Sequence, residues 1–488
     1  MEIHERSFVL EKRPGFWRFW LKRLAKVLLL MVIVGVCAQL WRHYRISKRL
    51  EETLADIDRA EPGWRLQDIE AAREQIPEEE NSARVVVAAT KLLPPNWPPK
   101  EFDELFSHLA PEEQLAAEDF ARLKQELDNV RPALEEARKL AIMPRGRHHI
   151  KYERNVINTL LNDQAEGRRI TRMLVLDALR LDQECDFKNA LISCRAVLNT
   201  ARALGDEPMA VSQLVRTACV ILACQSVERA LAQGEPPPKE LADFQKWLDD
   251  EDVFPDLLIT ARGERAANQE TFDALESGDS PISSLSNGRP DWNERLFGFL
   301  YRDNIRDEHP TMLALMSQWV AIATLPSWEQ SAAEQQFNQN IRDLPKAAIL
   351  TRLLLPALTR LGEASRRKHA YLRCLNVALA AERYRREKKT WPNAIDQLCP
   401  KYLETVPLDP FDGQSLRYRR LEDGVMVYAV SNDGVDDGGN LDREHPNQPG
   451  VDIGYRLWDV AKRRQPARPK PPKPPAPPLM RPPAFNPG

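Results

Sequence analysis

The chain contains 488 residues, carries a formal net charge of −3, and is 43% hydrophobic and 29% charged. This composition supports a buried core and excludes wholesale disorder, and the length allows two or three domains. Only 20 glycines accompany 38 prolines, a ratio that disfavours glycine-rich nucleotide-binding architectures. The near-neutral charge argues against a chain-wide binder of nucleic acid. We therefore expect neither a nucleotide nor a nucleic acid as a partner.

An uncharged apolar run occupies residues 27–41 (VLLLMVIVGVCAQLW) and is closed by Lys26 and Arg42. As a helix it spans about 22 Å, and snorkelling lysine and arginine stems extend it toward the roughly 30 Å core of a bilayer. Aromatic residues on both flanks suit the membrane interfaces. We therefore predict a single transmembrane helix over residues 27–41. The alternatives are a buried core helix, a cleaved signal peptide, and lipoprotein processing at Cys37.

Basic residues on the two sides of this run predict its orientation. Seven precede it within residues 1–26, and four follow it before residue 50. The side richer in lysine and arginine stays in the cytoplasm. We therefore expect a cytoplasmic basic segment over residues 1–26, a single pass through the inner (cytoplasmic) membrane, and an extracytoplasmic bulk. The other six cysteines then meet an oxidising compartment, where Cys374 and Cys399 either form a disulfide or stay free thiols.

Residues 42–355 are typical of an extracytoplasmic domain that is almost entirely helical. Gly205 and Pro208 separate two helices as an antiparallel hairpin. The alternation of small and large side chains there is typical of tetratricopeptide-like units. No second copy of this unit recurs at a fixed period, so a plain helical bundle remains the alternative to a repeat array. Apolar spacing predicts these helices, the first of them long and amphipathic: residues 111–141, 152–181, 187–204 and 209–233.

Motifs for phosphate loops, dinucleotide binding, serine hydrolases and zinc proteases do not occur in the sequence. His148 and His149 follow two arginines, and His369 lies in a run of basic residues. We interpret these histidines as surface residues. Cys219 and Cys224 are five residues apart, a spacing that does not place both thiols on one face of a helix to bind a metal. We interpret them as buried small side chains. The sequence therefore predicts a protein that is not an enzyme.

A different sequence pattern begins at Pro356. Proline suits the first turn of a helix, so we predict that a helix starts there. Leucines on one face extend that helix to about residue 388. Asp423 and the glycine after it form a hairpin signal between two segments that alternate with period two. The sequence therefore predicts a small α+β module over residues 356–459. Its strand candidates are residues 415–420, 425–431 and 452–458.

The stretch between the last two strand candidates is rich in glycines and carboxylates. It contains a single arginine, Arg443, and the following acids: Asp433, Asp436, Asp437, Asp442, Glu444 and Asp452. Clustered carboxylates repel one another, whereas Ca²⁺ binds about six to eight oxygens from carboxylates and backbone carbonyls. We therefore expect a calcium-binding loop, with a solvated acidic turn as the alternative.

Several spaced motifs follow the long helix in this order: Trp391-Pro392, Asp409-Pro410, Gly413, Tyr418, Tyr428, Asp433-Gly434, Gly438-Gly439 and Asp452-Ile453. Over about residues 362–459, this order resembles the C-terminal domain of the major pseudopilin of type II secretion. In that family the loop binds calcium. The resemblance implies Asp433 and Asp452 as side-chain ligands, with Asp436 or Asp437 and the backbone carbonyl of Val430 as additions.

Residues 460–488 form a basic tail, with eleven prolines among the last 24 residues. A proline-dense segment cannot make regular hydrogen-bond ladders and has few apolar side chains to bury. We therefore expect a disordered or polyproline-II tail that is dispensable for folding.

Together these features predict a membrane-anchored bacterial envelope protein. It would bind or scaffold protein partners through the helical domain and a calcium-stabilised pseudopilin-like module. The module also supports an alternative by analogy, an accessory component of a type II secretion or pilus-like machine. A second alternative is an envelope enzyme whose site lies in the helical domain.

Overall fold

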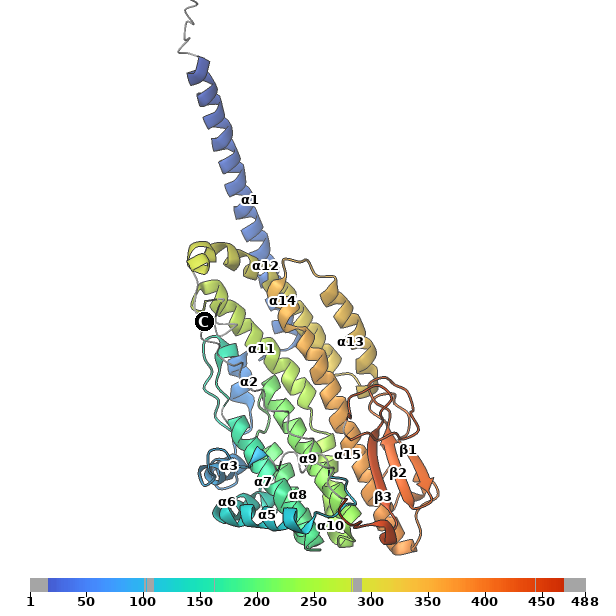
Figure 1. Cartoon of the computed structure of the whole chain (residues 1–488). Helices are drawn as coiled ribbons and strands as arrows, with labels where there is room; N and C mark the ends of the chain where they lie inside the picture. The colour runs from blue at the N-terminus through green and yellow to red at the C-terminus, as the bar shows by residue number, and fades with distance from the viewer. Residues whose placement is uncertain are drawn as a thin grey trace, which may run out of the picture.

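The computed structural model describes residues 16–100, 102, 109–161, 163–281, 283, 292–443 and 445–468. Over these residues the protein is mainly helical, with a small antiparallel sheet near its C-terminal end (Figure 1). The predicted mainly α class is therefore confirmed. Residues 1–15 of the basic segment, Glu444, and residues 469–488 of the tail lie outside the described residues.

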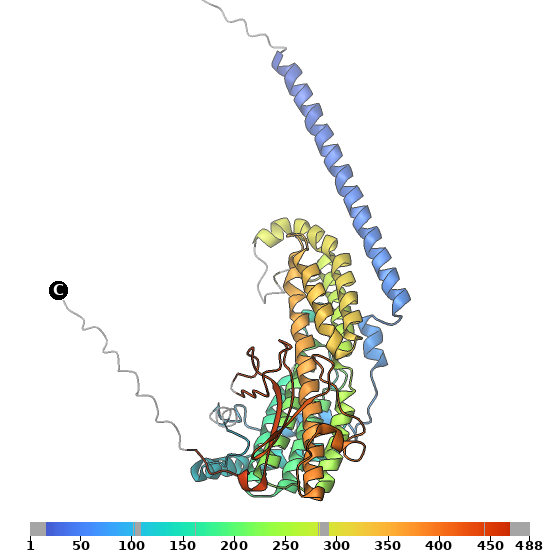
Figure 2. The same ribbon diagram turned by 90° about the vertical axis from the view of Figure 1, so that its right-hand side faces the viewer.

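The N-terminal helix α1 (Phe16–Ala60) is 45 residues long, which corresponds to about 67 Å. Its apolar part is long enough to cross a membrane and is not buried against the rest of the protein. Figure 2 shows α1 projecting well beyond the helical body. The helix joins the body through its C-terminal half, where Arg42 Nη2 lies 3.1 Å from Asp307 Oδ2 and Arg49 Nη2 lies 3.1 Å from Thr311 Oγ1.

The next elements are α2 (Leu66–Ala72), α3 (Ser82–Lys91), α5 (Ala117–Asn129), α6 (Arg131–Arg138) and the short η1 (Lys139–Ile142). The single long helix predicted over residues 111–141 is therefore wrong. The chain leaves helical geometry at Val130 (φ −112°, ψ 20°), two residues before Pro132. Proline removes a backbone donor and opens a new helix more readily than it continues an old one. The apolar spacing continues across this break and so concealed it.

Three antiparallel helices form the centre of the body: α7 (Asp163–Gln183), α8 (Phe187–Arg202) and α9 (Ala210–Gln233). The predicted hairpin is confirmed, with Gly205 at φ +60° between α8 and α9. The helix predicted from residue 152 starts later, since only the short η2 (Val156–Asn158) precedes α7. Helix α9 is apolar enough to cross a membrane but is mostly buried. As predicted, Cys219 and Cys224 are buried in this core.

A second group of helices packs beside the first. It comprises α11 (Asp256–Ser277), α12 (Trp292–Ala323), α13 (Ser327–Arg342) and α14 (Ile349–Leu354). The helix before it, α10 (Pro238–Asp252), packs with the first group and with α15 (Pro356–Lys388) instead. The core of the second group contains Phe272 and the rings of Trp319 and Phe337, whose centroids are 5.3 Å apart. This part of the body supports the base of α1 through α12.

The helix α15 (Pro356–Lys388) packs against a sheet of three antiparallel strands in the order β1-β2-β3 (Figure 1). The strands are β1 (Arg417–Leu421), β2 (Gly424–Ala429) and β3 (Ile453–Trp458). Both the predicted helix and the predicted strands are confirmed to within two residues. Central pairs include Tyr418 with Val427 and Val427 with Tyr455. The inner faces of this sheet and of α15 share one continuous core with α7, α8 and α9.

The chain after β3 stays on the body through η5 (Val460–Lys462) to residue 468. The backbone of Gln465 donates to Glu112 O at 2.6 Å and accepts from Gln114 N at 2.8 Å. The prediction of a disordered tail is therefore wrong for residues 460–468. These first residues of the expected tail contribute hydrogen bonds to the fold.

All seven cysteines lie in described segments, and each is a free thiol. Cys374 is buried, with its Sγ 3.6 Å from the carbonyl oxygen of Ile453. Cys399 is half-buried at the end of the short η4 (Ile395–Leu398). The structure therefore corresponds to the free-thiol alternative for this pair.

Candidate functional site

The acidic loop, residues 430–452, connects β2 to β3. It begins at Val430, whose amide donates to Oδ2 of the buried Asp409 at 2.8 Å. Near its end, the amide of Asp452 donates to Asn440 O at 2.9 Å. Left-handed glycines turn the backbone between these two points, including Gly438 (φ +70°) and Gly439 (φ +79°). Glycine adopts this conformation without the strain that a Cβ would impose.

Asp409 and Arg417 hold the start of this loop in place. The Asp409 carboxylate also accepts the amide of Phe411 at 2.9 Å and pairs with the guanidinium of Arg417. Burial raises the pKa of Asp409 to about 6, against the opposing effect of these partners. Arg417 also pairs with Asp412, and its Nε lies 3.8 Å from Asp436 Oδ2. One buried carboxylate and one arginine therefore link the turn before β1 to the acidic loop.

Asp433 and Asp436 use much of their hydrogen-bonding capacity within the loop. Asp433 accepts the amide of Val435 at 3.1 Å and the amide of Gly450 at 3.0 Å, one on each carboxylate oxygen. Asp436 Oδ1 accepts the amide of Gly438 at 2.9 Å. The same oxygen accepts the Tyr428 hydroxyl at 3.1 Å. These two aspartates therefore shape the loop backbone.

Asp437 and Asp452 differ, because each keeps one buried oxygen without a hydrogen-bond partner among the described residues. The open atoms are Oδ2 of Asp437 and Oδ1 of Asp452; the other oxygen of Asp452 accepts the Gly439 amide at 2.8 Å. Burial raises the pKa of Asp452 above its ordinary value, and the negative charges of Asp436 and Asp437 raise it further. Buried polar atoms without partners are costly and are rare in native proteins.

These open oxygens fit a hard cation such as Ca²⁺, which is bound by oxygen ligands. Asp437 and Asp452 suit this role best, whereas Asp433 suits it less because backbone amides already engage both of its oxygens. The described residues hold no group of three His, Cys, Asp or Glu side chains arranged to hold a metal ion. The assignment of the Val430 carbonyl and the four aspartates as calcium ligands therefore stays a prediction.

The acidic loop also reaches the helical body. The guanidinium of Arg443 pairs with Glu228 on α9, a carboxylate that is 0% exposed. Burial raises the pKa of Glu228, and Arg443 opposes that rise. From α15, Arg367 Nη1 donates to Pro446 O at 2.6 Å. The conformation of the loop therefore depends on two helices of the body as well as on the sheet.

Sequence reasoning missed the charged groups that α15 buries. Arg366 is 1% exposed and binds both carboxylate oxygens of Glu334 at 2.7 Å. Lys368 is 0% exposed, with its Nζ 3.0 Å from Asp256 Oδ2. Although burial opposes the effect, the Lys368 charge lowers the pKa of Asp256. A basic run flanked on both sides by helical apolar residues was the one available signal for such burial.

The prediction that all three histidines are surface residues is wrong for His148 and His369. His369 is half-buried, with its Nδ1 2.7 Å from Asp252 Oδ1. His148 is buried, with its Nδ1 3.3 Å from Asp163 Oδ2. His149 is exposed as predicted. Each of these two rings has a carboxylate partner from a different segment, so both are parts of the packed body.

In comparisons with known proteins, no family model, no curated protein and no solved structure matches the chain.

Proposed function

We propose that the chain is a membrane-anchored envelope protein that acts by binding or scaffolding protein partners. In this proposal residues 27–41 of α1 cross the cytoplasmic membrane, the N-terminus lies in the cytoplasm, and the body is extracytoplasmic. The exposed apolar surface of α1 supports the anchor, because an uncovered apolar helix of this length is unstable in water. The excess of basic residues before the run supports the orientation.

We further propose that Ca²⁺ stabilises the acidic loop. The observation that carries this proposal is the pair of buried, unpartnered oxygens on Asp437 and Asp452. A bound cation would satisfy both atoms and would remove the repulsion between neighbouring carboxylates. Because Arg443 and Arg367 connect the loop to the helical body, an ordered loop would present one defined surface to a partner.

The resemblance of residues 362–459 to the major pseudopilin supports a second candidate role, in a secretion or pilus-like machine. A long helix on a small antiparallel sheet is compatible with it. Capture of partners from isolated membranes, followed by their identification, separates a general scaffold from a component of such a machine.

Thermal unfolding of the solubilised full chain tests the calcium proposal. We expect a higher Tm in Ca²⁺ than in EGTA, because an ion that binds only the folded form adds about 2.7 kcal/mol at a hundredfold excess over Kd. Mg²⁺ should substitute poorly, since it requires a tighter octahedral shell. An equal Tm in EGTA and Ca²⁺ would refute the site.

Isosteric variants identify the ligands. In Asp437→Asn and Asp452→Asn, we expect the Ca²⁺ response to be lost and the Tm in EGTA to equal or exceed that of the wild type. This combination follows because each change removes both a ligand charge and a source of repulsion. Glu422→Gln, at an exposed position in the β1–β2 turn, is the matched control and should respond like the wild type. A full response in both aspartate variants would show that other residues bind the ion.

A further inference from the structure

The turn between α13 and α15, residues 342–360, lies at the end of the body from which α1 projects (Figure 1). The structure describes every residue of this turn, which contains α14. In the topology proposed above, on which the following proposal rests, a span at residues 27–41 directs this end of the body toward the bilayer. The turn is therefore placed to meet lipid.

Contacts between α1 and α12 show how close to the span the body reaches. Arg42 Nη2 lies 3.1 Å from Asp307 Oδ2, and Arg49 Nη2 lies 3.1 Å from Thr311 Oγ1. Arg42 is the first residue after the apolar run, and Arg49 is about 10 Å farther along the helix. The part of α12 from Asp307 to Thr311 is therefore level with the stretch of α1 that directly follows the span.

This stretch of α1 corresponds to the headgroup layer of the bilayer. The apolar run spans about 22 Å of a hydrocarbon core that is about 30 Å thick, so a centred run leaves about 4 Å of core beyond each of its ends. The headgroup layer adds about 5–7 Å on each side. Its outer edge is therefore about 10 Å beyond Trp41, the last residue of the run. Arg42 to Arg49 of α1 lie within that distance, and so does the part of α12 that they contact.

Glu308 connects this part of α12 to α14. Its carboxylate accepts the amide of Ile349 on one oxygen and the amide of Thr351 on the other, each at 2.9 Å. Leu350 and Thr351 are buried on the side of α14 that faces the body. These contacts hold α14 at the level of the headgroup layer with one face turned inward.

The outward face of α14 is apolar. Ile349 is 63% exposed and Leu353 is 67% exposed. Residues four positions apart lie on the same side of a helix, so these two side chains form one surface. A single exposed apolar side chain needs no explanation, whereas a pair opposite a buried face makes the helix amphipathic.

The turn that carries this apolar face is basic. Residues 342–360 contain four basic residues and one acidic residue, Asp343. Arg352 Nη1 donates to Leu344 O at 2.9 Å and so also holds the turn together. Apolar side chains beside exposed cations are typical of surfaces that lie in the headgroup layer of anionic membranes. All four basic side chains are exposed: Arg342, Lys346, Arg352 and Arg360.

We propose that residues 342–360 form a second contact with the bilayer in which α1 is inserted. Ile349 and Leu353 lie among the headgroups and the first carbons of the acyl chains. Lys346 and Arg360 bind the phosphates of anionic phospholipids. Together with α1, this contact holds the body at two points and prevents it from turning about the axis of its anchor.

Quenching of fluorescence by lipid tests the contact on the full chain in nanodiscs. The quencher is a nitroxide near the headgroup end of the acyl chain of phosphatidylcholine. The accessible and half-buried cysteines Cys37, Cys185 and Cys399 are changed to serine, and an environment-sensitive maleimide dye is attached to Leu353→Cys. We expect the quencher to lower the emission of this dye at least twofold.

Two native cysteines, each kept in turn as the labelled site, separate this contact from the anchor. A dye on Cys37 lies in the proposed span and should be quenched. Cys185 lies in the turn between α7 and α8, where Arg464 Nη2 donates to Gln183 O at 2.7 Å. That turn is at the end of the body opposite to α14 (Figure 1), so a dye there should not be quenched. Quenching at Cys37 without quenching at Leu353→Cys would overturn the second contact and leave the anchor intact, whereas quenching at neither would overturn both.

The composition of the lipid tests the role of the cations. Phosphatidylglycerol in the nanodiscs should increase the quenching of the dye on Leu353→Cys, and Lys346→Gln/Arg360→Gln should abolish this increase. The absence of any increase in the parent protein would overturn the preference for anionic lipid.

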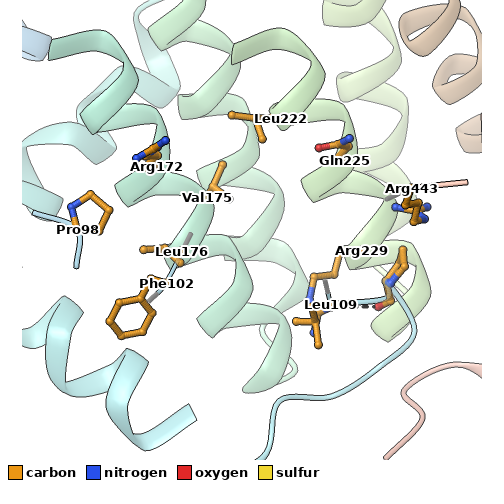
Figure 3. Close-up of a pocket in the computed structure, with 11 residues that line it drawn as sticks. Pro98, Phe102, Leu109, Arg172, Val175, Leu176, Leu222, Gln225, Arg229 and Arg443 are labelled. Carbon is orange, nitrogen blue, oxygen red and sulfur yellow. Dashed lines mark hydrogen bonds between the residues drawn. The ribbon is translucent and has the colours of Figure 1, made fainter. Parts of the chain in front are cut away.

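The matched control is Arg172→Gln/Lys188→Gln, which removes one arginine and one lysine that are exposed on α7 and α8. Figure 3 shows Arg172 on α7, a helix that is not part of the turn. This control should respond to phosphatidylglycerol like the parent protein. Equal responses in the two double variants would contradict the assignment of Lys346 and Arg360 as lipid-binding residues.

Discussion

Arg463 Nη2 lies 2.8 Å from Glu382 Oε2, and both side chains are almost completely buried. This ion pair attaches the chain that follows β3 to the C-terminal half of α15. Glu382 also accepts from Arg385 Nε at 2.9 Å. The carboxylate therefore serves two arginines, and the loss of the acid has a different consequence from the loss of Arg463.

We expect Glu382→Ala to lower the free energy of unfolding by about 3–5 kcal/mol, because it leaves Arg463 as an uncompensated buried charge. Arg463→Ala should cost less, since Arg385 still neutralises Glu382. Chemical denaturation of the full chain measures both changes. Arg59→Ala, which breaks an exposed pair with Asp56, is the control and should cost less than about 1 kcal/mol. A smaller loss for Glu382→Ala than for Arg463→Ala would contradict this account.

We expect replacement by alanine to have opposite effects on stability at two helical glycines, Gly263 and Gly167. A Cβ at Gly263 of α11 would lie 1.7 Å from the carbonyl oxygen of Pro208, which is backbone and cannot rotate away. Gly263→Ala should therefore destabilise the protein by about 1–3 kcal/mol. A Cβ at Gly167 of α7 would meet nothing within 4 Å, so Gly167→Ala should stabilise it by about 0.5–1 kcal/mol. The urea midpoints of the two variants measure both changes. Effects of the same sign would refute the close packing of Gly263 on Pro208.

Asp182 predicts a pH dependence of stability. Burial raises its pKa from 3.8 to about 8, so between these values the folded chain holds a proton that the unfolded chain releases. This difference destabilises the fold increasingly as the pH rises, by up to about 1.4 kcal/mol per pH unit, and the penalty is complete above pH 8.

The Asp182→Asn variant has no titratable group at this position, so its stability should lack this pH-dependent penalty. Its stability should equal that of the wild type near pH 4 and should exceed it by a growing margin up to pH 8. Denaturation curves at several pH values provide the test. A margin that is constant with pH would mean that Asp182 is ionised in the folded state.

Cys185 allows a direct test of the proposed topology, because its thiol is exposed, whereas Cys194, Cys219, Cys224 and Cys374 are buried. A membrane-impermeant maleimide added to intact spheroplasts should label Cys185, and Cys185→Ser should reduce that label to what the half-buried Cys399 contributes. Labelling only after lysis would place the body in the cytoplasm.

The sequence predicted α15 and the three strands well because their boundaries depend on local chemistry. Pro356 opens the helix, and the hairpin at Asp423 fixes the pairing of β1 with β2. The sequence failed where distant segments decide the environment. Arg366 pairs with Glu334, which is 32 residues away on another helix, and a basic run alone does not reveal such a partner.

The candidate site shows the same distinction. The acidic composition and glycine turns of the loop were visible in the sequence, whereas the unequal roles of its aspartates were not. Asp433 accepts the amides of Val435 and Gly450, whereas Asp452 accepts the Gly439 amide on one oxygen and keeps the other open. These contacts depend on how the folded loop places its backbone amides.

Helix α1 continues without a break from the apolar run to Ala60, so no flexible tether separates residues 27–41 from the body. The 19 residues from Arg42 to Ala60 correspond to about 28 Å of rigid rod. In the proposed topology this rod sets a fixed height and a fixed azimuth for the body above the bilayer. A change in the tilt of the span would then act as a lever and would move the distal sheet by a larger distance than the membrane end. The body would therefore present its surfaces to partners in one fixed orientation relative to the membrane, without the rotational freedom that a flexible linker would allow.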